Sequence, residues 1–123
     1  MTDPIPALGK LPNLKSLSFY SGSYEGREMV CSSGRFPQLL VLKLWKLEML
    51  EELRVEVGTM QNLRELDIRA CKKLTFPTGL KHLKTLRELN SRDMPEEFTA
   101  RTEEMRSKFG MSLPHFLPLL KIN

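Results

Sequence analysis

The sequence predicts an α/β repeat solenoid, a short horseshoe whose parallel β-sheet lines the concave face. A leucine motif occurs about four times, starting at Leu14, Leu39, Leu63 and Leu86, which are 25, 24 and 23 residues apart. This period is typical of leucine-rich repeats, in which each repeat adds one short strand to a shared sheet. Such a solenoid offers an open, extended surface in place of a closed cavity. We therefore expect the chain to bind and not to catalyse.

One strand is expected in each repeat, at about residues 16–20, 41–45, 65–69 and 88–91. Successive side chains of a strand point to opposite faces, so alternate apolar residues of each motif should enter the core. Ser91 is the exception, because it stands where the other repeats carry an apolar side chain. The last strand is therefore expected to be the weakest.

The segment after the second strand, KLEMLEELRVEV, fits two patterns. Leu47, Leu50, Leu53 and Val57 have helical spacing, whereas Leu53, Val55 and Val57 alternate as in a strand. The sequence leaves both open. Under either interpretation this segment forms the outer half of a repeat, because the next leucine motif follows it.

The repeats are expected to occupy residues 1–98 and to begin in the middle of a repeat. Residues 3–13 have the pattern of a repeat tail whose strand is absent, with Leu8 and Leu11 directed inward. The first strand would then present an open sheet edge, which favours self-association. We expect that further repeats preceded this one, in evolution or in a longer parent chain.

A capping helix is expected over residues 95–110, followed by an apolar tail over 111–123 that either packs under the cap or is disordered. Pro95 suits the first helical position, acidic residues follow it, and Gly110 fits a C-terminal stop. One face of this helix carries the side chains expected to cover the last strand: Phe98, Thr102, Met105 and Phe109.

The outward side chains of the four strands should align into columns, because neighbouring strands lie about 4.8 Å apart. The three columns are Tyr20, Trp45, Arg69 and Arg92; Ser18, Lys43, Asp67 and Asn90; and Ser16, Val41, Glu65 and Glu88. Aromatic and arginine side chains dominate binding hot spots. Trp45, the only tryptophan, can stack on Arg69. The alternative is that Trp45 only covers its neighbours.

Composition and charge disfavour nucleic acid and membrane partners. The chain is 41% hydrophobic and 28% charged, with a net charge of +4. Its densest basic stretches lack interleaved aromatic residues, and the acidic residues Glu65, Asp67 and Glu88 interrupt any basic face. No apolar run is long enough to span a membrane.

No catalytic, metal or cofactor site is expected. His82 and His115 have no acidic or thiol partners at ligand spacing, and Cys31 and Cys71 do not form a metal-binding or disulfide pattern. Cys71 most simply fills a turn position inside the coil, where its side chain satisfies backbone groups. No phosphate-loop motif is present, so ATP binding is not expected.

Five segments carry a specific family resemblance over residues 3–98: DPIPALGKLPNLKSL at 3–17, YEGREMVCSSGRFPQLLVLKL at 24–44, LEELRVEVGTMQNLRELDIRACKKL at 50–74, PTGLKHLKTLREL at 77–89 and MPEEF at 94–98. Through them the chain resembles the C-terminal leucine-rich-repeat region of plant disease-resistance proteins of the coiled-coil, nucleotide-binding (NB-ARC), leucine-rich-repeat class.

The resemblance implies a cytoplasmic recognition module of a plant innate-immune receptor. In that family the concave residues recognise pathogen effectors or the host proteins that effectors modify, and the repeats help to hold the nucleotide-binding module in its resting state. Carried over residue by residue, the recognition positions would be Tyr20, Lys43, Trp45, Asp67, Arg69, Asn90 and Arg92.

The chain also departs from that family. It has neither the phosphate loop nor the coiled-coil segment, one spacing residue is lost between Leu74 and Pro77, and the tail beyond about residue 100 ends differently. The alternative interpretation is therefore a truncated structural remnant, or a decoy repeat protein, with no independent signalling activity.

Overall fold

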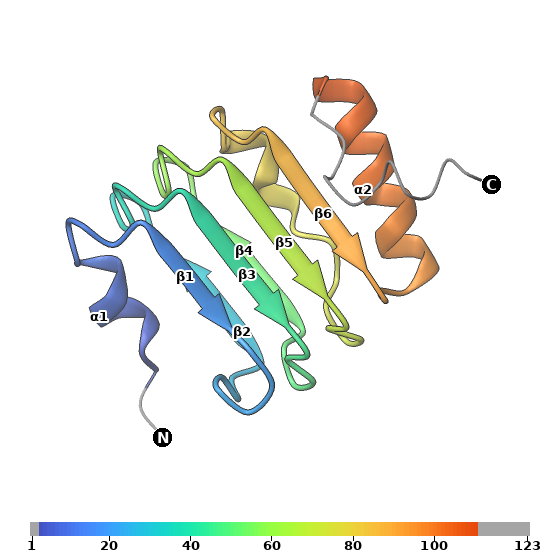
Figure 1. Cartoon of the computed structure of the whole chain (residues 1–123), viewed down its shortest axis with the longest axis horizontal. Helices are drawn as coiled ribbons and strands as arrows, with labels where there is room; N and C mark the ends of the chain where they lie inside the picture. The colour runs from blue at the N-terminus through green and yellow to red at the C-terminus, as the bar shows by residue number, and fades with distance from the viewer. Residues whose placement is uncertain (1–2, 111–123) are drawn as a thin grey trace.

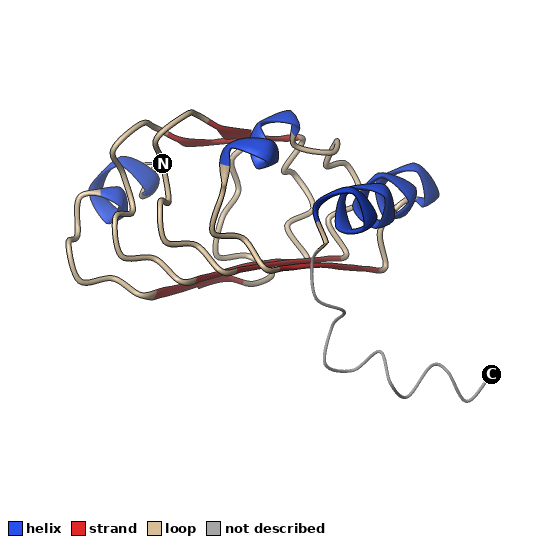
Figure 2. Cartoon of the chain, turned by 90° about the horizontal axis from the view of Figure 1, so that it is seen from above, coloured by secondary structure: helices blue, strands red, loops and turns tan. Residues whose placement is uncertain are grey.

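The computed structural model describes residues 3–110, which form a curved parallel solenoid (Figures 1 and 2). Four strands build one sheet in the order β1-β3-β5-β6: β1 (Ser16–Phe19), β3 (Val41–Trp45), β5 (Glu65–Arg69) and β6 (Glu88–Arg92). All neighbouring pairs in this sheet are parallel. The predicted solenoid of about four repeats is confirmed.

Rows of inward side chains run across the sheet and form the core. One row joins Leu17, Leu42, Leu66 and Leu89, which are paired in register, and its last three members are at most 1% exposed. This one-residue-per-repeat stacking is the physical consequence of the near-constant repeat length. Ser91 is the register partner of Ile68 and is only partly buried, yet β6 forms and extends one residue beyond it.

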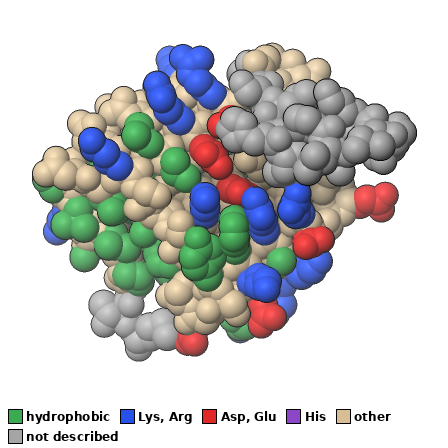
Figure 3. Space-filling view, viewed as in Figure 1, with side chains coloured by type: hydrophobic (Ala, Val, Ile, Leu, Met, Phe, Trp, Pro, Cys, Tyr) green, Lys and Arg blue, Asp and Glu red, His purple; other side chains and the backbone are tan. Residues whose placement is uncertain are grey.

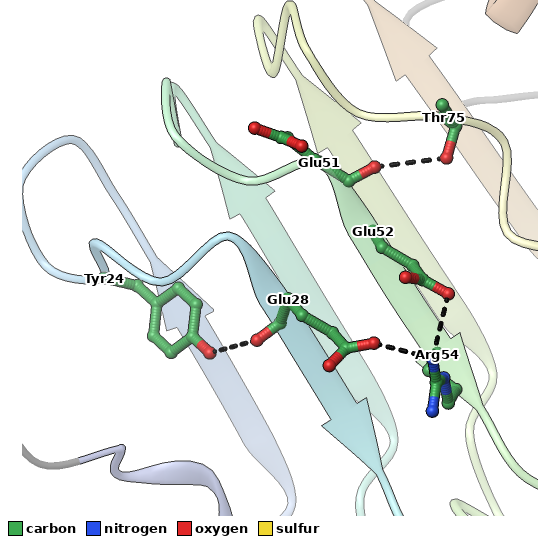
Figure 4. Close-up of polar contacts among 6 residues, drawn as sticks. All are labelled: Tyr24, Glu28, Glu51, Glu52, Arg54 and Thr75. Atoms are coloured by element: carbon green, nitrogen blue, oxygen red, sulfur yellow. Dashed lines mark hydrogen bonds and ion pairs between the residues drawn. The ribbon is translucent and has the colours of Figure 1, made fainter.

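A second, two-stranded sheet lies on the opposite side of the core, where Figure 2 shows strands facing the larger sheet. It pairs β2 (Glu28–Cys31) with β4 (Glu52–Val55) in parallel. The segment that fits both a helix and a strand by sequence is therefore a strand, with Leu53 and Val55 buried. On the outer surface, Arg54 bridges to Glu28 at 2.8 Å (Figure 4).

Hydrogen bonds from side-chain hydroxyls to backbone oxygens fix the loops next to this smaller sheet. The Tyr24 hydroxyl donates to the backbone oxygen of Glu28 at 2.8 Å, and the Thr75 hydroxyl donates to that of Glu51 at 3.1 Å (Figure 4). Beyond β4, the next repeat forms a 3-10 helix, η1 (Thr78–His82), in place of a third outer strand. The outer sheet therefore stops at β4 within the described residues.

The N-terminal part is a short helix, α1 (Ile5–Gly9). The Asp3 carboxylate accepts a hydrogen bond from the backbone N–H of Ile5 at 3.0 Å, and Ile5 enters the core. Leu8 packs against the core, whereas Leu11 is 45% exposed. The prediction that Leu11 points inward is wrong, because the helix ends at Gly9 and the chain turns before Leu11 toward β1.

The C-terminal helix α2 (Glu96–Phe109) lies beside β6, as Figure 1 shows, and the predicted capping helix is confirmed. Phe98, Thr102 and Met105 are buried on its inner face. The Arg106 guanidinium donates through Nε to the backbone oxygen of Leu89 at 2.7 Å, which ties the helix to the last strand. The predicted apolar tail, residues 111–123, lies outside the described residues.

We expect the buried thiol of Cys31 to make folding stability sensitive to alkali. Burial raises its pKa from about 9 to about 12, so the folded chain holds the protonated form after the unfolded chain has ionised. The contribution of Cys31 to the free energy of unfolding is fully present below pH ~9 and is lost as the pH rises toward ~12. Relative to Cys31→Ala, the native chain should lose roughly 2–3 kcal/mol more between about pH 8 and about pH 11.

Urea unfolding of both proteins at these two pH values checks the prediction. The comparison cancels the effect on stability of the other groups that titrate at alkaline pH, because the variant retains them all. Parallel losses of stability in the two proteins would contradict it.

The candidate recognition surface

The sheet register produces the three columns expected from the sequence. Ser16, Val41, Glu65 and Glu88 share one row across the strands; Ser18, Lys43, Asp67 and Asn90 share the next; Trp45, Arg69 and Arg92 share the third. Tyr20 follows β1 directly and lies beside Trp45. The structure thus brings the seven predicted recognition residues together on one open face, the concave surface. That they bind a partner stays a prediction.

A stack of aromatic and cationic side chains dominates the strand ends. The rings of Tyr20 and Trp45 lie 5.1 Å apart at 56°, and the guanidinium carbon of Arg69 lies 4.1 Å from the centre of the Trp45 ring. The Lys43 ammonium lies 5.5 Å from the same ring. The predicted stacking of Arg69 on Trp45 is therefore confirmed. Cation–π contacts of this kind contribute about 0.5–1 kcal/mol at exposed sites.

Tyr20 is the exposed end of this stack, at 47% of its surface. A tight turn sets its position, since the Tyr20 N–H donates to the Ser23 hydroxyl at 2.8 Å and the Ser23 N–H donates to the Tyr20 carbonyl at 2.8 Å. The ring is thus held in place by its backbone while its face stays accessible. That arrangement lowers the entropy cost of binding through this side chain.

Asp67 has a different role from the one its outward direction suggests. Its two carboxylate oxygens accept hydrogen bonds from Arg69, at 3.1 Å from Nε and 3.0 Å from Nη2. Asp67 is only 2% exposed and Asn90 only 5%. Both side chains point outward but are covered; over Asp67 lies Arg69, which reaches back from two residues further along the same strand. Asp67 therefore orients Arg69 against Trp45.

The polar atoms of this surface that are buried without a hydrogen-bond partner among the described residues include Nε1 of Trp45 and Oδ1 of Asn90. Buried polar groups in native proteins are nearly always paired, so each exception needs an explanation. One atom is a donor and the other an acceptor.

Charged side chains of both signs lie on the concave surface. Figure 3 shows a row of Lys and Arg side chains below a small acidic group, and further Lys and Arg side chains above that group. By register, Lys43, Arg69 and Arg92 lie toward the strand ends, and Glu65 and Glu88 lie at the strand starts.

A hollow on the other side of the molecule is not indicated by any sequence pattern. It measures about 410 Å³ and lies between β4 and η1, with Arg54, Thr75 and His82 among its lining residues.

Within residues 3–110, no group of three or more acidic, histidine and cysteine side chains could hold a metal ion. In the same part of the chain, no helix has the length and apolarity that a bilayer crossing requires.

Cys71 occupies the predicted turn position inside the coil. Its thiol contacts the backbone oxygens of Leu44 at 3.3 Å and Arg69 at 3.4 Å, and its N–H donates to the sulfur of Met94 at 3.3 Å. Burial raises the pKa of the Cys71 thiol, which keeps it protonated and able to donate. Both Cys31 and Cys71 are free and buried. The predicted structural role of Cys71 is confirmed.

Comparison with known proteins shows similarity to plant disease-resistance proteins. The chain is 51% identical over 100 residues to "Probable disease resistance RPP8-like protein 2" of Arabidopsis thaliana, which is 80% of this chain and 11% of that protein. It is 52% identical over 87 residues to "Disease susceptibility protein LOV1" of the same plant, covering 71% of this chain and 10% of that protein. A third disease resistance protein from this plant is 39% identical over 122 residues, 98% of this chain and 13% of the relative.

The chain spans about one tenth of the length of these relatives. No protein-family model matches the chain. No solved structure matches it significantly.

Proposed function

Because this chain is homologous over most of its length to plant disease-resistance proteins of the nucleotide-binding, leucine-rich-repeat class, we propose that it is a protein-recognition module of an innate-immune receptor. The family resemblance predicted from the sequence is confirmed by these relatives. On this proposal the concave surface binds a pathogen effector or a host protein that an effector modifies. Contact with the nucleotide-binding module of a full-length parent would contribute to autoinhibition.

The observation that carries the proposal is the stack of Tyr20, Trp45 and Arg69 on the open face. Tyrosine, tryptophan and arginine are the residues most enriched in binding hot spots. Here they are preordered by a turn at Tyr20 and by the two hydrogen bonds from Arg69 to Asp67. Ordering these side chains before binding lowers the entropy cost of binding through them.

We further propose that the module works in the cytoplasm, without catalysis and without a cofactor. This follows the family to which its relatives belong and the open form of the concave surface, which does not enclose a substrate. The alternative is a structural remnant or decoy. A remnant or decoy would show no partner whose affinity depends on Trp45. The proposal also includes self-association of two copies of the chain through the edge of β1. Among the described strands, β1 pairs with β3 alone.

Trp45→Ala tests the proposal. For a protein partner bound by the full 123-residue chain, we expect affinity to fall by about 2 kcal/mol or more, roughly thirtyfold, because truncation removes the centre of the stack. Isothermal titration calorimetry measures the affinity, and thermal unfolding by circular dichroism verifies the fold.

Val57→Ala is the matched control. Val57 is 65% exposed and follows β4 on the opposite side of the solenoid, so its truncation should leave affinity unchanged. Binding that tolerates Trp45→Ala as well as Val57→Ala would contradict recognition through the concave surface.

A further inference from the structure

We propose that the free edge of β1 accepts one extended strand of the leucine-repeat type, supplied by another polypeptide and laid parallel to β1. The inference rests on the proposed function in treating this edge as open to a partner, and it names the chemistry and the direction of the occupant. Three features of the N-terminal end carry it: leucines without full cover, free backbone groups, and two layers that end at different places.

Two leucines at the N-terminal end are exposed at positions that are buried in every later repeat. Leu14 and Leu17 pack against the core but stay partly exposed. Their counterparts in the next three repeats are at most 7% exposed: Leu39, Leu63 and Leu86 for the first, and Leu42, Leu66 and Leu89 for the second. Each counterpart has a neighbouring repeat on its N-terminal side. Figure 3, oriented as Figure 1, shows hydrophobic side chains gathered at the end that carries β1.

The backbone of β1 is also free on this side. The Lys15 carbonyl accepts a hydrogen bond from the N–H of Val41 at 3.2 Å, so it points toward β3. Successive residues of a strand turn their backbone groups to opposite sides, so the N–H and C=O groups of Ser16 and Ser18 point away from β3, where no described strand lies. Native sheet edges are usually protected by charged residues, proline or a bulge, and β1 contains no charged residue and no proline.

The two layers of the solenoid end at different places. In the layer of the smaller sheet, α1 lies beside β2, whereas in the layer of the larger sheet no described element continues beyond β1 (Figures 1 and 2). At the opposite end, α2 packs on β6 and buries Phe98 and Met105. The N-terminal end therefore lacks cover on its inner layer alone, and a single strand would complete it.

A parallel strand with leucine-repeat spacing matches this edge. The inward residues Leu14, Leu17 and Phe19 are three and then two residues apart, so a neighbour of the same spacing aligns with all of them only when it runs parallel. The pairing of β1 with β3 is the template for this contact, because Leu17 is the register partner of Leu42. In strand addition, main-chain hydrogen bonds supply affinity and the alternate side chains supply specificity.

A second copy of the chain matches the edge less well. Among the described strands of the larger sheet it can offer only its own β1, because β6 is paired with β5 and covered by α2. A two-fold axis makes pairing of β1 with β1 antiparallel, which opposes the leucine motif in reverse order. We therefore assign the edge to a strand of another polypeptide and make the second copy an outcome of the test.

A synthetic strand tests the inference. The probe is a blocked decapeptide with the sequence of residues 61–70 (QNLRELDIRA), which contains the motif of the third repeat and has no net charge. We expect saturable binding to the full chain, measured by fluorescence anisotropy of a labelled peptide. At a concentration tenfold above its Kd, the unlabelled peptide should raise the melting temperature by about 5 °C or more. The reversed sequence is the control of equal composition and should not bind saturably.

Two methylated peptides identify the side that pairs. In β5, the Arg64 carbonyl faces β6, and the backbone groups of Leu66 and Ile68 share this direction. Methylation of the backbone nitrogens at these two positions removes the donors that would face β1, so we expect binding to weaken about tenfold or more. Methylation at the positions of Glu65 and Asp67 adds the same two groups to the opposite side. It should change the affinity by less than about twofold.

A proline variant of the protein locates the edge. Ser18→Pro removes the N–H that points away from β3 and leaves the pairing with β3 in place, and proline is tolerated on edge strands in this orientation. The peptide should bind about tenfold more weakly or worse. Ser18→Ala is the matched control, because it removes the same hydroxyl but keeps the N–H. Circular dichroism verifies both folds, and the methylated peptides decide the question without any change to the protein.

The outcomes separate this inference from the proposed recognition. Equal binding of the two methylated peptides, or binding of the reversed peptide as tight as that of the original, would overturn it. So would a dimer that Ser18→Pro abolishes in a chain that does not bind the peptide, which would assign the edge to a second copy. Each of these results leaves recognition through Trp45 intact. A protein partner whose affinity did not depend on Trp45 would instead overturn that recognition and leave the strand edge.

Discussion

Leu66→Ala is expected to destabilise the chain by about 3–5 kcal/mol. Leu66 is fully buried in β5, between its register partners Leu42 and Leu89. Truncation removes the apolar area of the side chain and leaves a cavity that two parallel neighbours cannot close. Domains of this size have total stabilities of about 5–15 kcal/mol, so the loss is a large fraction of the whole.

Urea unfolding followed by circular dichroism measures this effect. Leu11→Ala is the matched control, because the same change is made at a leucine that is 45% exposed. We expect it to cost less than about 1 kcal/mol. Similar losses for the two variants would show that Leu11, and not the stacked leucine row alone, supports the fold.

Gly79→Ala is expected to destabilise the chain by about 3 kcal/mol, although it adds a single methyl group. Gly79 lies in η1 against β4, and a Cβ built on it would be 2.1 Å from the backbone oxygen of Val55. That is far inside contact distance, and the obstructing atom belongs to backbone that cannot rotate away. The two segments must therefore separate.

Thr78→Ala is the control for this prediction, since Thr78 is an exposed residue of the same short helix. Its replacement should change the free energy of unfolding by less than about 0.5 kcal/mol. Thermal unfolding of both variants gives the comparison. Equal stability of Gly79→Ala and the native chain would show that η1 does not pack closely against β4.

Most of the architecture follows from the sequence because the fold repeats. A leucine every 23–25 residues assigns the strands, their parallel order and the rows of the core. Strand alternation then places Lys43, Trp45 and Arg69 on one face. These are local rules, so a single sequence suffices to apply them.

The outer half of each repeat depends on tertiary contacts. Residues 46–57 carry both a helical and a strand pattern, and pairing with β2 makes residues 52–55 the strand β4. One repeat later the corresponding segment forms η1 instead. Local propensity does not separate these outcomes, because the hydrogen-bond partner that decides between them lies about 24 residues away in the chain.

The sequence by itself therefore determined the repeat architecture, the C-terminal helix and the membership of the concave surface. Only the tertiary structure decided which of its side chains are accessible. Asp67 and Asn90 share the outward direction of Lys43, yet both are almost fully buried, and the Asp67 carboxylate is paired with Arg69 through two hydrogen bonds. Direction is a property of one strand, whereas burial and unsatisfied atoms such as Trp45 Nε1 are properties of all the strands packed together.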